Sequence, residues 1–394
     1  MAYRWELLLW LWLAFFFNQA DRQVFNVVLP LLHRELGLSD VQLGLIGSVF
    51  VIVNGLMVPA AGFAGDFVSR KRIIVVSLFA WSLATVSTGW GATVAYFVMV
   101  RSLATGVGEA FFFPSAVALL AAHHDKTRAR ALSLFQTSVY CGLIASGWIG
   151  GALAQRFGWR MVFWVFGGFG VVLSVAMQGR LKQTEGAMSH MTSAQIGASA
   201  RAIVSQPVAR YIALASAATI FVNIGYLAWI TSYLYDRFQM PLEKAGLTSM
   251  LFHHLLAFVG VMLGGIVSDR YALARPRIRM EIQAFALLAG APFLLLLGRA
   301  ATEWGAYGAL GAFGFFRGLF ESNLYPAFYS VIEPRYHSAA SGLLIAFSFL
   351  VASAAPVLLG KVKESAGLAP GISALSAFYV AGAVAAFAGS RKLC

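Results

Sequence analysis

Long apolar runs dominate this chain, and only short polar stretches separate them. About 20 apolar residues in a helix span the hydrocarbon core of a bilayer. Twelve such runs follow one another, at residues 5–32, 40–63, 72–90, 93–121, 131–154, 160–179, 209–234, 243–267, 281–299, 304–331, 338–359 and 371–390. Lipid gives the backbone no hydrogen-bond partner, so runs of this kind fold as helices. The sequence therefore predicts an all-α membrane protein with twelve transmembrane helices.

The composition excludes several other classes of protein. Only 11% of the side chains are charged and 59% are hydrophobic, whereas soluble domains are roughly a quarter charged. Cys141 and Cys394 are the only cysteines, too few for a disulfide scaffold. The first run is too long for a cleaved signal peptide. Ser39 and Gln42 have the spacing of a capping box, which predicts a helix start at the second run.

The chain has a net charge of +13, and its basic residues are distributed as membrane topology requires and not as a patch that binds nucleic acid. With a cytoplasmic N-terminus, 18 basic residues fall in the inside segments and 8 in the outside loops. The positive-inside rule then predicts that both termini are cytoplasmic. We expect a multi-pass protein of the cytoplasmic (inner) membrane, with the lipid bilayer as a partner and no nucleic acid.

The longest connection divides the runs into six and six. This predicts an N-terminal six-helix bundle at 1–180, a cytoplasmic linker at 181–207 and a C-terminal six-helix bundle at 208–394. Thr192 and Gln195 have the spacing to cap a short surface helix in the linker, although a mobile linker explains the sequence equally well.

The two halves repeat the same punctuation. Gly-x-x-x-Asp ends at Asp66 in the first half and at Asp269 in the second, 203 positions apart. Glu-x4-Pro begins at Glu109 and again at Glu321, 212 positions apart. Repeats in the same order indicate two pseudo-symmetric six-helix units, an arrangement that transporters use for alternating access.

Residues 62–72, with Gly-x-x-x-Asp and a basic tail, resemble the signature loop of the major facilitator superfamily. Within that superfamily, residues 18–22, 29–30, 37–40 and 106–110 are similar to two groups. One is the Spinster-like family, associated with lysolipids and sphingolipids. The other is the anion:cation symporter family, associated with sugar acids and other organic anions driven by protons or sodium. The chain departs from the usual pattern at Phe67, at Ser69, and at Arg101, which lies eight residues before Glu109 instead of seven.

The resemblance implies the major facilitator fold and a cytoplasmic latch that closes the two halves on the inside. The residues that would form this gate are Asp66, Arg70, Arg72 and Asp269. Basic residues in such a loop are also explained by topology alone, but the aspartates are not.

Ionisable residues inside the runs are the strongest functional candidates, because a charge in the bilayer costs several kcal/mol. Asn18, Arg22 and Asn26 recur at i, i+4, i+8 in the first run, and Asp21 lies beside that stripe. At 1.5 Å per residue, Asp21 lies roughly 16 Å and Glu109 roughly 24 Å from the outer end of its run. Both positions are near the midplane, where transporters bind substrate and coupling ion.

These residues suggest a coupling mechanism. Arg22 would hold an anionic group, because its planar fork fits a carboxylate or phosphate. Asp21 would compete for Arg22, and protonation of Asp21 or Glu109 would free the arginine. The alternative is a static network of these three residues that only fixes helix packing.

Several weaker candidates lie in other runs. Arg317 and Glu321 share a helix face at i, i+4, as a structural pair or a substrate contact. His253 is a candidate proton relay with Glu321, although packing explains His253 and His254 as well. Further substrate-binding candidates are Gln136, Tyr140, Asn223, Tyr226 and Asn323.

The combined pattern favours a secondary active transporter that works by alternating access and couples a small organic anion, such as a carboxylate or sugar acid, to a proton gradient. Sodium is the other coupling ion that the sequence leaves open. The alternative is a Spinster-like carrier of lysolipids or similar amphiphiles, for which residues 111–113 (Phe-Phe-Phe) would supply an apolar surface. The chain has no Gly-x4-Gly-Lys, His-Glu-x-x-His or Gly-x-Ser-x-Gly motif, which argues against ATP drive and an enzyme. A receptor is the third option. We expect a monomer with no cofactor and no metal.

Overall fold

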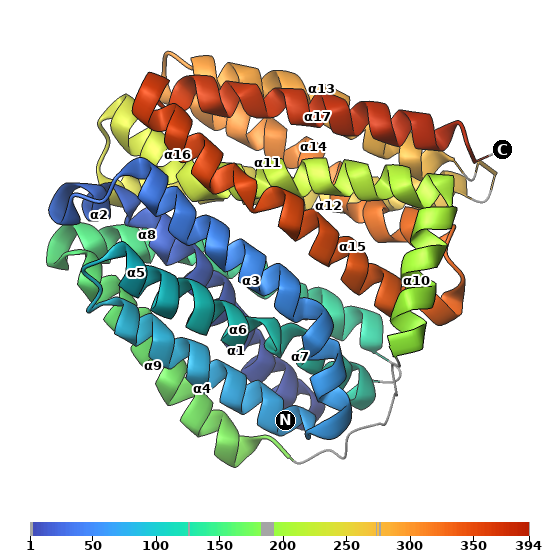
Figure 1. The fold of residues 1–394 in the computed structure, drawn as a ribbon, viewed down its shortest axis with the longest axis horizontal. Coiled ribbons are helices and arrows are strands. Elements are labelled where there is room, and N and C mark those ends of the chain that lie inside the picture. The colour runs from blue at the N-terminus through green and yellow to red at the C-terminus, as the bar shows by residue number, and fades with distance from the viewer. Residues whose placement is uncertain (1–2, 125–126, 183–192, 273, 276, 394) are drawn as a thin grey trace. The chain divides into compact units, whose positions relative to one another are not determined.

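The computed structural model describes residues 3–124, 127–182, 193–272, 274–275 and 277–393, and within these ranges every regular element is a helix. The chain divides into two compact units (Figure 1). Unit 1 consists of Met1–His190 and Leu234–Leu247, and unit 2 of Met191–Tyr233 and Thr248–Cys394.

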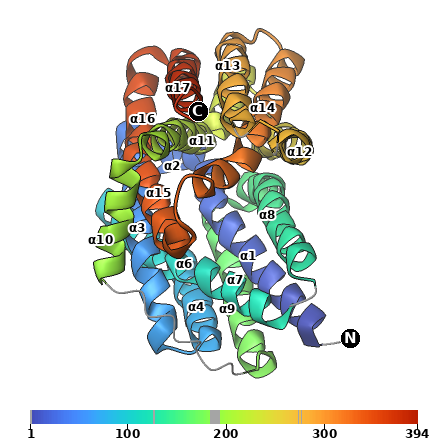
Figure 2. The ribbon, with the colours of Figure 1, turned by 90° about the vertical axis from the view of Figure 1, so that its right-hand side faces the viewer.

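Unit 1 is built from the first ten helical elements. In it α1 lies beside α8, and α4 lies beside α9 (Figure 1 and Figure 2). The elements are α1 (Tyr3–Val27), α2 (Leu29–Leu36), α3 (Asp40–Phe67), α4 (Arg70–Thr88), α5 (Val94–Phe97), the π-helix η1 (Val98–Ala104), α6 (Thr105–Ala110), α7 (Phe112–His123), α8 (Arg128–Phe157) and α9 (Trp159–Arg180).

Local sequence explains the ends of the first helices. α1 ends at Val27, and Pro30 lies in the first turn of α2, where a missing N–H costs no hydrogen bond. The capping box expected before α3 is confirmed: the Ser39 N–H donates to Gln42 Oε1 at 2.9 Å, and the Gln42 N–H donates to Ser39 Oγ at 3.3 Å. These devices satisfy backbone groups that a helix end leaves unpaired.

Contacts between aromatic rings in the core of unit 1 join its helices. The rings of Phe15 and Phe135 lie parallel with centroids 4.7 Å apart, which joins α1 to α8. Trp81 meets Phe112 edge to face at 5.3 Å, which joins α4 to α7. Lipid tails are as apolar as these side chains, so close packing rather than exclusion from water holds such helices together.

Unit 2 contains the remaining helices, and in it α13 packs against α14 and α17 (Figure 1). They are α10 (Ser193–Ser205), α11 (Pro207–Phe238), α12 (Leu242–Ala272), α13 (Ile278–Arg299), α14 (Glu303–Tyr329), the 3-10 turn Pro334–Tyr336, α15 (His337–Ala352), α16 (Ala354–Ala366) and α17 (Leu368–Ser390). α10 falls within the expected linker; Thr192 and the side chain of Gln195, its expected capping residues, lie outside the described part of the chain.

Ten segments of the described chain are long and apolar enough to cross a membrane, and each overlaps one of the expected runs. The other two expected runs correspond to α1, with 25 residues, and α14, with 27. Both have spanning length but carry ionisable residues at mid-helix, which lowers their hydropathy. The two helices that apolar composition does not mark therefore carry candidate site residues, Arg22 on α1 and Arg317 on α14.

The end of α11, the start of α12 and their connection belong to unit 1. Trp148 Nε1 on α8 donates to Glu243 Oε1 at 3.0 Å, and Arg156 lies 3.6 Å from the same carboxylate. A Cβ on Gly151 would lie 2.6 Å from the Leu242 carbonyl oxygen, so only glycine permits this approach. This is the packing role expected of small residues in membrane helices.

Candidate functional site

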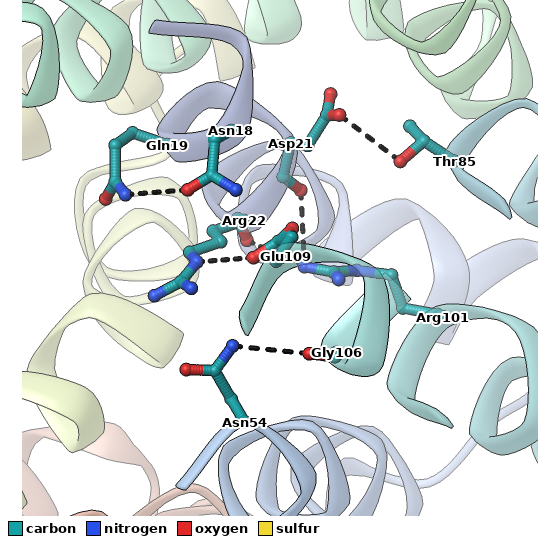
Figure 3. A network of polar contacts seen from close by, with 9 residues as sticks. All are labelled: Asn18, Gln19, Asp21, Arg22, Asn54, Thr85, Arg101, Gly106 and Glu109. Carbon is teal, nitrogen blue, oxygen red and sulfur yellow. Dashed lines mark hydrogen bonds and ion pairs between the residues drawn. The ribbon is translucent and has the colours of Figure 1, made fainter. Parts of the chain in front are cut away.

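The centre of unit 1 contains an ion pair between two helices. Arg22 on α1 donates through Nε to Glu109 Oε2 on α6 (Figure 3). The Glu109 side chain is fully buried, whereas 28% of the Arg22 side chain is exposed. A buried carboxylate is thus paired with a cation that other molecules can still reach.

Asp21 points away from this pair. Its side chain is buried, and Oδ2 accepts a hydrogen bond from Thr85 Oγ1 on α4 at 3.3 Å. Adjacent helical residues point about 100° apart, which separates Asp21 from the guanidinium next to it. Glu109 is the carboxylate that occupies this arginine here, and the expected competition of Asp21 for Arg22 stays a prediction.

Arg101 is a central residue, although in the sequence it stands out only as a departure from a pattern. It is 4% exposed, and its Nη2 donates to the backbone oxygens of Asp21 at 3.2 Å and Arg22 at 3.1 Å (Figure 3). Its guanidinium also lies 4.5 Å from the ring centroid of Phe50, as a cation–π contact. The rule that every ionisable residue in a span is a candidate would have found it.

The four charged groups balance one another. Two guanidinium groups, of Arg22 and Arg101, lie in one cluster with the carboxyl groups of Asp21 and Glu109 (Figure 3). With all four ionised the cluster is neutral, which is the inexpensive state for buried charges. Adding one proton or one anion breaks this balance, and adding both restores it.

Polar side chains extend the cluster along α1 and across to α3. Gln19 Nε2 donates to Asn18 Oδ1 at 2.9 Å, and Asn26 Nδ2 donates to Gln23 Oε1 at 3.1 Å. Asn54 on α3 donates to the Gly106 oxygen at 3.4 Å (Figure 3). This stripe gives the site amide groups for hydroxyl or carboxylate recognition.

The α8 candidates lie at the surface of unit 1. Gln136 is exposed and Tyr140 is half-buried. Their neighbour Thr137 accepts a hydrogen bond from Trp12 Nε1 on α1 at 2.9 Å. The two helices are therefore tied together where these polar side chains emerge.

Unit 2 has its own charged cluster, at α12 and α14. Arg317 donates through Nη2 to Glu321 at 3.1 Å, and its Nη1 lies 2.9 Å from His253 Nε2. A guanidinium has no acceptor, so Nε2 must be the unprotonated ring nitrogen of a neutral His253. The structure brings together His253, Arg317 and Glu321.

Aromatic rings surround this second cluster. The Tyr226 ring lies 4.7 Å from His253, and its hydroxyl donates to the Ser249 oxygen at 2.7 Å. His254 is buried as well, and its Nδ1 lies 2.8 Å from the Met250 oxygen one turn earlier. Backbone bonds therefore occupy Tyr226 and His254, while His253 contacts the charge.

The two asparagine candidates differ in exposure. Asn223 on α11 is half-buried. Asn323 is fully buried: its Nδ2 donates to the Leu319 oxygen at 3.0 Å, and its own backbone oxygen accepts from Gln283 Nε2 at 2.9 Å. Asn323 thus fastens α14 to α13 and does not line an open surface.

Comparison with known proteins identifies the family. The sequence profile of the Major Facilitator Superfamily matches residues 11–356. The chain belongs to the Major Facilitator Superfamily. It is a multi-pass membrane transporter and not an enzyme. The proteins that it resembles are transporters as well.

Relatives and solved structures within the superfamily extend over almost the whole chain. A probable L-galactonate transporter of Escherichia coli is 24% identical, over 91% of this chain and 83% of the relative. A hexuronate transporter of Bacillus subtilis is 24% identical, over 97% of this chain and 92% of the relative. The crystal structure of a bacterial homologue of the human lysosomal transporter Spinster has a TM-score of 0.88 and 20% identity, covering 99% of this chain and 98% of that one.

The loops that resemble the superfamily's signature are partly described. Arg70 Nη1 donates to the Ala118 oxygen in the middle of α7 at 3.3 Å, and Arg72 is exposed. Asp269 on α12 lies 3.7 Å from Arg279 on α13. The side chain of Asp66 lies outside the described part. In the ranges that are described, no three His, Cys, Asp or Glu side chains gather as a metal site would require.

Proposed function

We propose that this protein is a secondary transporter that moves a small organic anion together with a proton by alternating access. The Arg22–Glu109 pair carries this proposal, because it joins a reachable cation to a fully buried carboxylate. A carboxylate substrate offers Arg22 the bidentate geometry that guanidinium groups prefer. The substrate would replace Glu109 as the partner of Arg22.

Proton coupling follows from the free-energy cost of leaving the Glu109 carboxylate without its arginine partner. Once Arg22 turns to a substrate, Glu109 would remain as an unpaired buried anion, which costs several kcal/mol. Protonation of Glu109 removes that cost, so anion and proton enter together. Asp21 is a second proton acceptor in the same cluster and interacts electrostatically with Glu109 and Arg101.

Polar residues of the two units suggest the substrate class. Asn18, Asn26, Gln136, Tyr140 and Asn223 offer amide and hydroxyl groups, as a polyhydroxylated acid requires. The names of the galactonate and hexuronate transporters describe such acids. Within unit 2, Arg317 is a further candidate for binding an anion, with His253 and Glu321 as its partners and the Tyr226 ring beside His253.

A Spinster-like carrier of lysolipids is the second candidate, and the resemblance to the Spinster homologue concerns the fold. Within residues 111–113, Phe112 is fully buried against Trp81, so this part of the apolar stretch is core rather than cavity wall. The anion reading is therefore the stronger one.

The remaining features complete the proposal. We propose twelve transmembrane helices in bundles 1–180 and 208–394 joined by a linker at 181–207, with both termini cytoplasmic in an inner membrane. We also propose that the transporter works as a monomer. Asp66, Arg70, Arg72 and Asp269 would form the cytoplasmic latch.

Uptake into proteoliposomes tests the function. The substrates would be one hexuronate, one dicarboxylate and one lysolipid, each with and without an inward proton gradient. We expect gradient-driven uptake of an acid, and a loss of at least about 100-fold in Arg22→Ala, since a buried charge pair loses a partner. Arg34→Ala is the matched control, because Arg34 is an exposed arginine on α2, outside the two helices that carry the pair.

Glu109→Gln separates binding from coupling. It resembles the protonated carboxyl, so substrate exchange across the membrane should persist while gradient-driven accumulation disappears. Normal gradient-driven uptake by both Arg22→Ala and Glu109→Gln would make the cluster structural. Movement of the lysolipid alone would favour the Spinster-like function.

A further inference from the structure

The helix that carries Arg101 and Glu109 is interrupted in the middle. α5, η1, α6 and α7 together form one span, Val94–His123, of which Val98–Ala104 is a π-helix. The Thr105 N–H bonds to the Val100 oxygen, five residues back. No proline lies between Val94 and Ala110, so the commonest cause of a helix irregularity is missing.

The interruption compensates for the spacing between the two charges. Arg101 and Glu109 are eight positions apart. In an unbroken α-helix that spacing places two side chains about 80° apart around the axis. A π turn closes its bonds five residues back instead of four and so absorbs one extra residue. Eight positions then turn as seven do, and the side chains lie within about 20° of each other.

Both side chains do face α1, and both act on Arg22. Arg101 holds the backbone oxygens of Asp21 and Arg22, while Glu109 holds the Arg22 side chain (Figure 3). Arg101 fixes the backbone position of Arg22, and Glu109 fixes the position of its guanidinium group. A rotation of about 80° between them would leave one of the two contacts unmade.

Other contacts hold the π-helix in this register. Ser102 Oγ donates to the Ile46 oxygen on α3 at 2.7 Å, and the Arg101 guanidinium lies over the rings of Phe25 and Phe50. Ala104, by contrast, is exposed. The inner face of the segment is thus held by contacts and its outer face is exposed. A residue can therefore be removed or added at the exposed position without loss of these contacts.

We propose that the π-helix Val98–Ala104 sets the rotational phase between Arg101 and Glu109, which makes Arg101 the positioning residue for Arg22. The inference rests on the proposed function, in that Arg22 is taken as the substrate-binding cation. Mid-helix π turns occur often at functional sites, and here the turn has a specific geometric task.

The test is a pair of length changes at one exposed position. Deletion of Ala104 leaves seven positions between the two residues, so a plain α-helix keeps them in phase. Insertion of one alanine after Ala104 leaves nine, which puts them about 80° apart with the π turn and about 180° apart without it. We expect the deletion to retain gradient-driven uptake and its pH profile within about twofold, and the insertion to lose about 100-fold, as misplaced contacts do.

This asymmetry is the distinguishing result, because a merely structural role predicts equal damage from both changes. Equal loss in the two variants, or normal uptake by the insertion, would overturn the proposal. If the insertion fails to fold, Arg101→Gln replaces it: it removes the clamp without a length change, and we expect a similar loss of uptake by protein that still elutes as one folded species in detergent. Normal uptake by Arg101→Gln would also overturn the proposal.

A structural readout separates this proposal from the proposed function. A cryo-electron microscopy structure of the deletion variant should show an unbroken α-helix with Arg101 still on the Asp21 and Arg22 oxygens. That result, with no uptake of any acid by the native protein, would leave the phase proposal standing and reject the anion transport. Loss of the Arg101 contacts in the deletion variant would reject the phase proposal whatever the substrate.

Discussion

Each unit places an arginine beside a glutamate, but the two pairs are held by different means. Arg22 and Glu109 come from two helices, and the glutamate is fully buried. Arg317 and Glu321 lie one turn apart on the same helix, and 47% of the Glu321 side chain is exposed. A pair within one helix forms wherever that helix goes. A pair between two helices depends on how those helices lie. Only the Arg22–Glu109 pair can therefore couple a change of binding partner to a movement of helices.

The largest expected difference between the units is in the response to losing the glutamate charge. Glu109→Gln should lower gradient-driven accumulation at least about 100-fold, because a buried partner of Arg22 is lost. Glu321→Gln should change it by no more than about fivefold, since half-exposed ion pairs contribute about 1 kcal/mol or less. Parallel uptake assays measure both, and a larger loss in Glu321→Gln would place the coupling in unit 2.

The pH dependence of uptake sharpens the same comparison. A proton that enters with the anion is a substrate, so native uptake should rise as the external pH falls. The rise should reach about tenfold per pH unit where the proton site is unsaturated, as for one proton per cycle. Glu109→Gln should abolish this slope and Glu321→Gln should keep it. A flat native profile would contradict proton coupling altogether.

Sequence alone predicted the helices well because apolar runs and capping residues act locally. The capping box at Ser39 is an example, confirmed in both of its bonds. It also selected Arg22 and Glu109, since residue counts along a helix give depth in the membrane. It did not tell which carboxylate pairs with Arg22. That depends on how α1 is rotated, which the packing of Phe15 against Phe135 helps to fix.

Two features of the site depend on geometry that sequence patterns do not contain. The π-helix has no residue signature in Val98–Ala104, and only the eight-residue spacing from Arg101 to Glu109 suggests an extra residue. The sequence suggests Asn323 as a site residue through its position near Arg317. Its burial against α13 follows from the rotation of α14, which sequence periodicity alone leaves open.

The cluster in unit 2 should respond to mutation through stability. His253→Ala removes the acceptor that faces Nη1 of Arg317, whose side chain is only 11% exposed, and should lower the free energy of unfolding by roughly 1–3 kcal/mol. His253→Gln keeps an oxygen acceptor and should lose less. Thermal unfolding of the two variants in detergent measures the difference. The pH slope of uptake should be unchanged in both, and its loss would instead make His253 a proton relay.

The smallest expected effects concern hydroxyl groups beside the two clusters. Thr85→Val removes the hydrogen bond to Asp21 Oδ2 while preserving the shape of the side chain. We expect uptake to change by several-fold, since one hydrogen bond at the long distance of 3.3 Å contributes roughly 0.5–1.5 kcal/mol. Ser322→Ala on α14 is the matched control, because Ser322 contacts Asn323 and the Leu319 oxygen but no charged group. It should alter uptake by less than about twofold. Comparable changes in the two variants would mean that Asp21 is a packing residue like Asn323, and that Glu109 alone carries the proton.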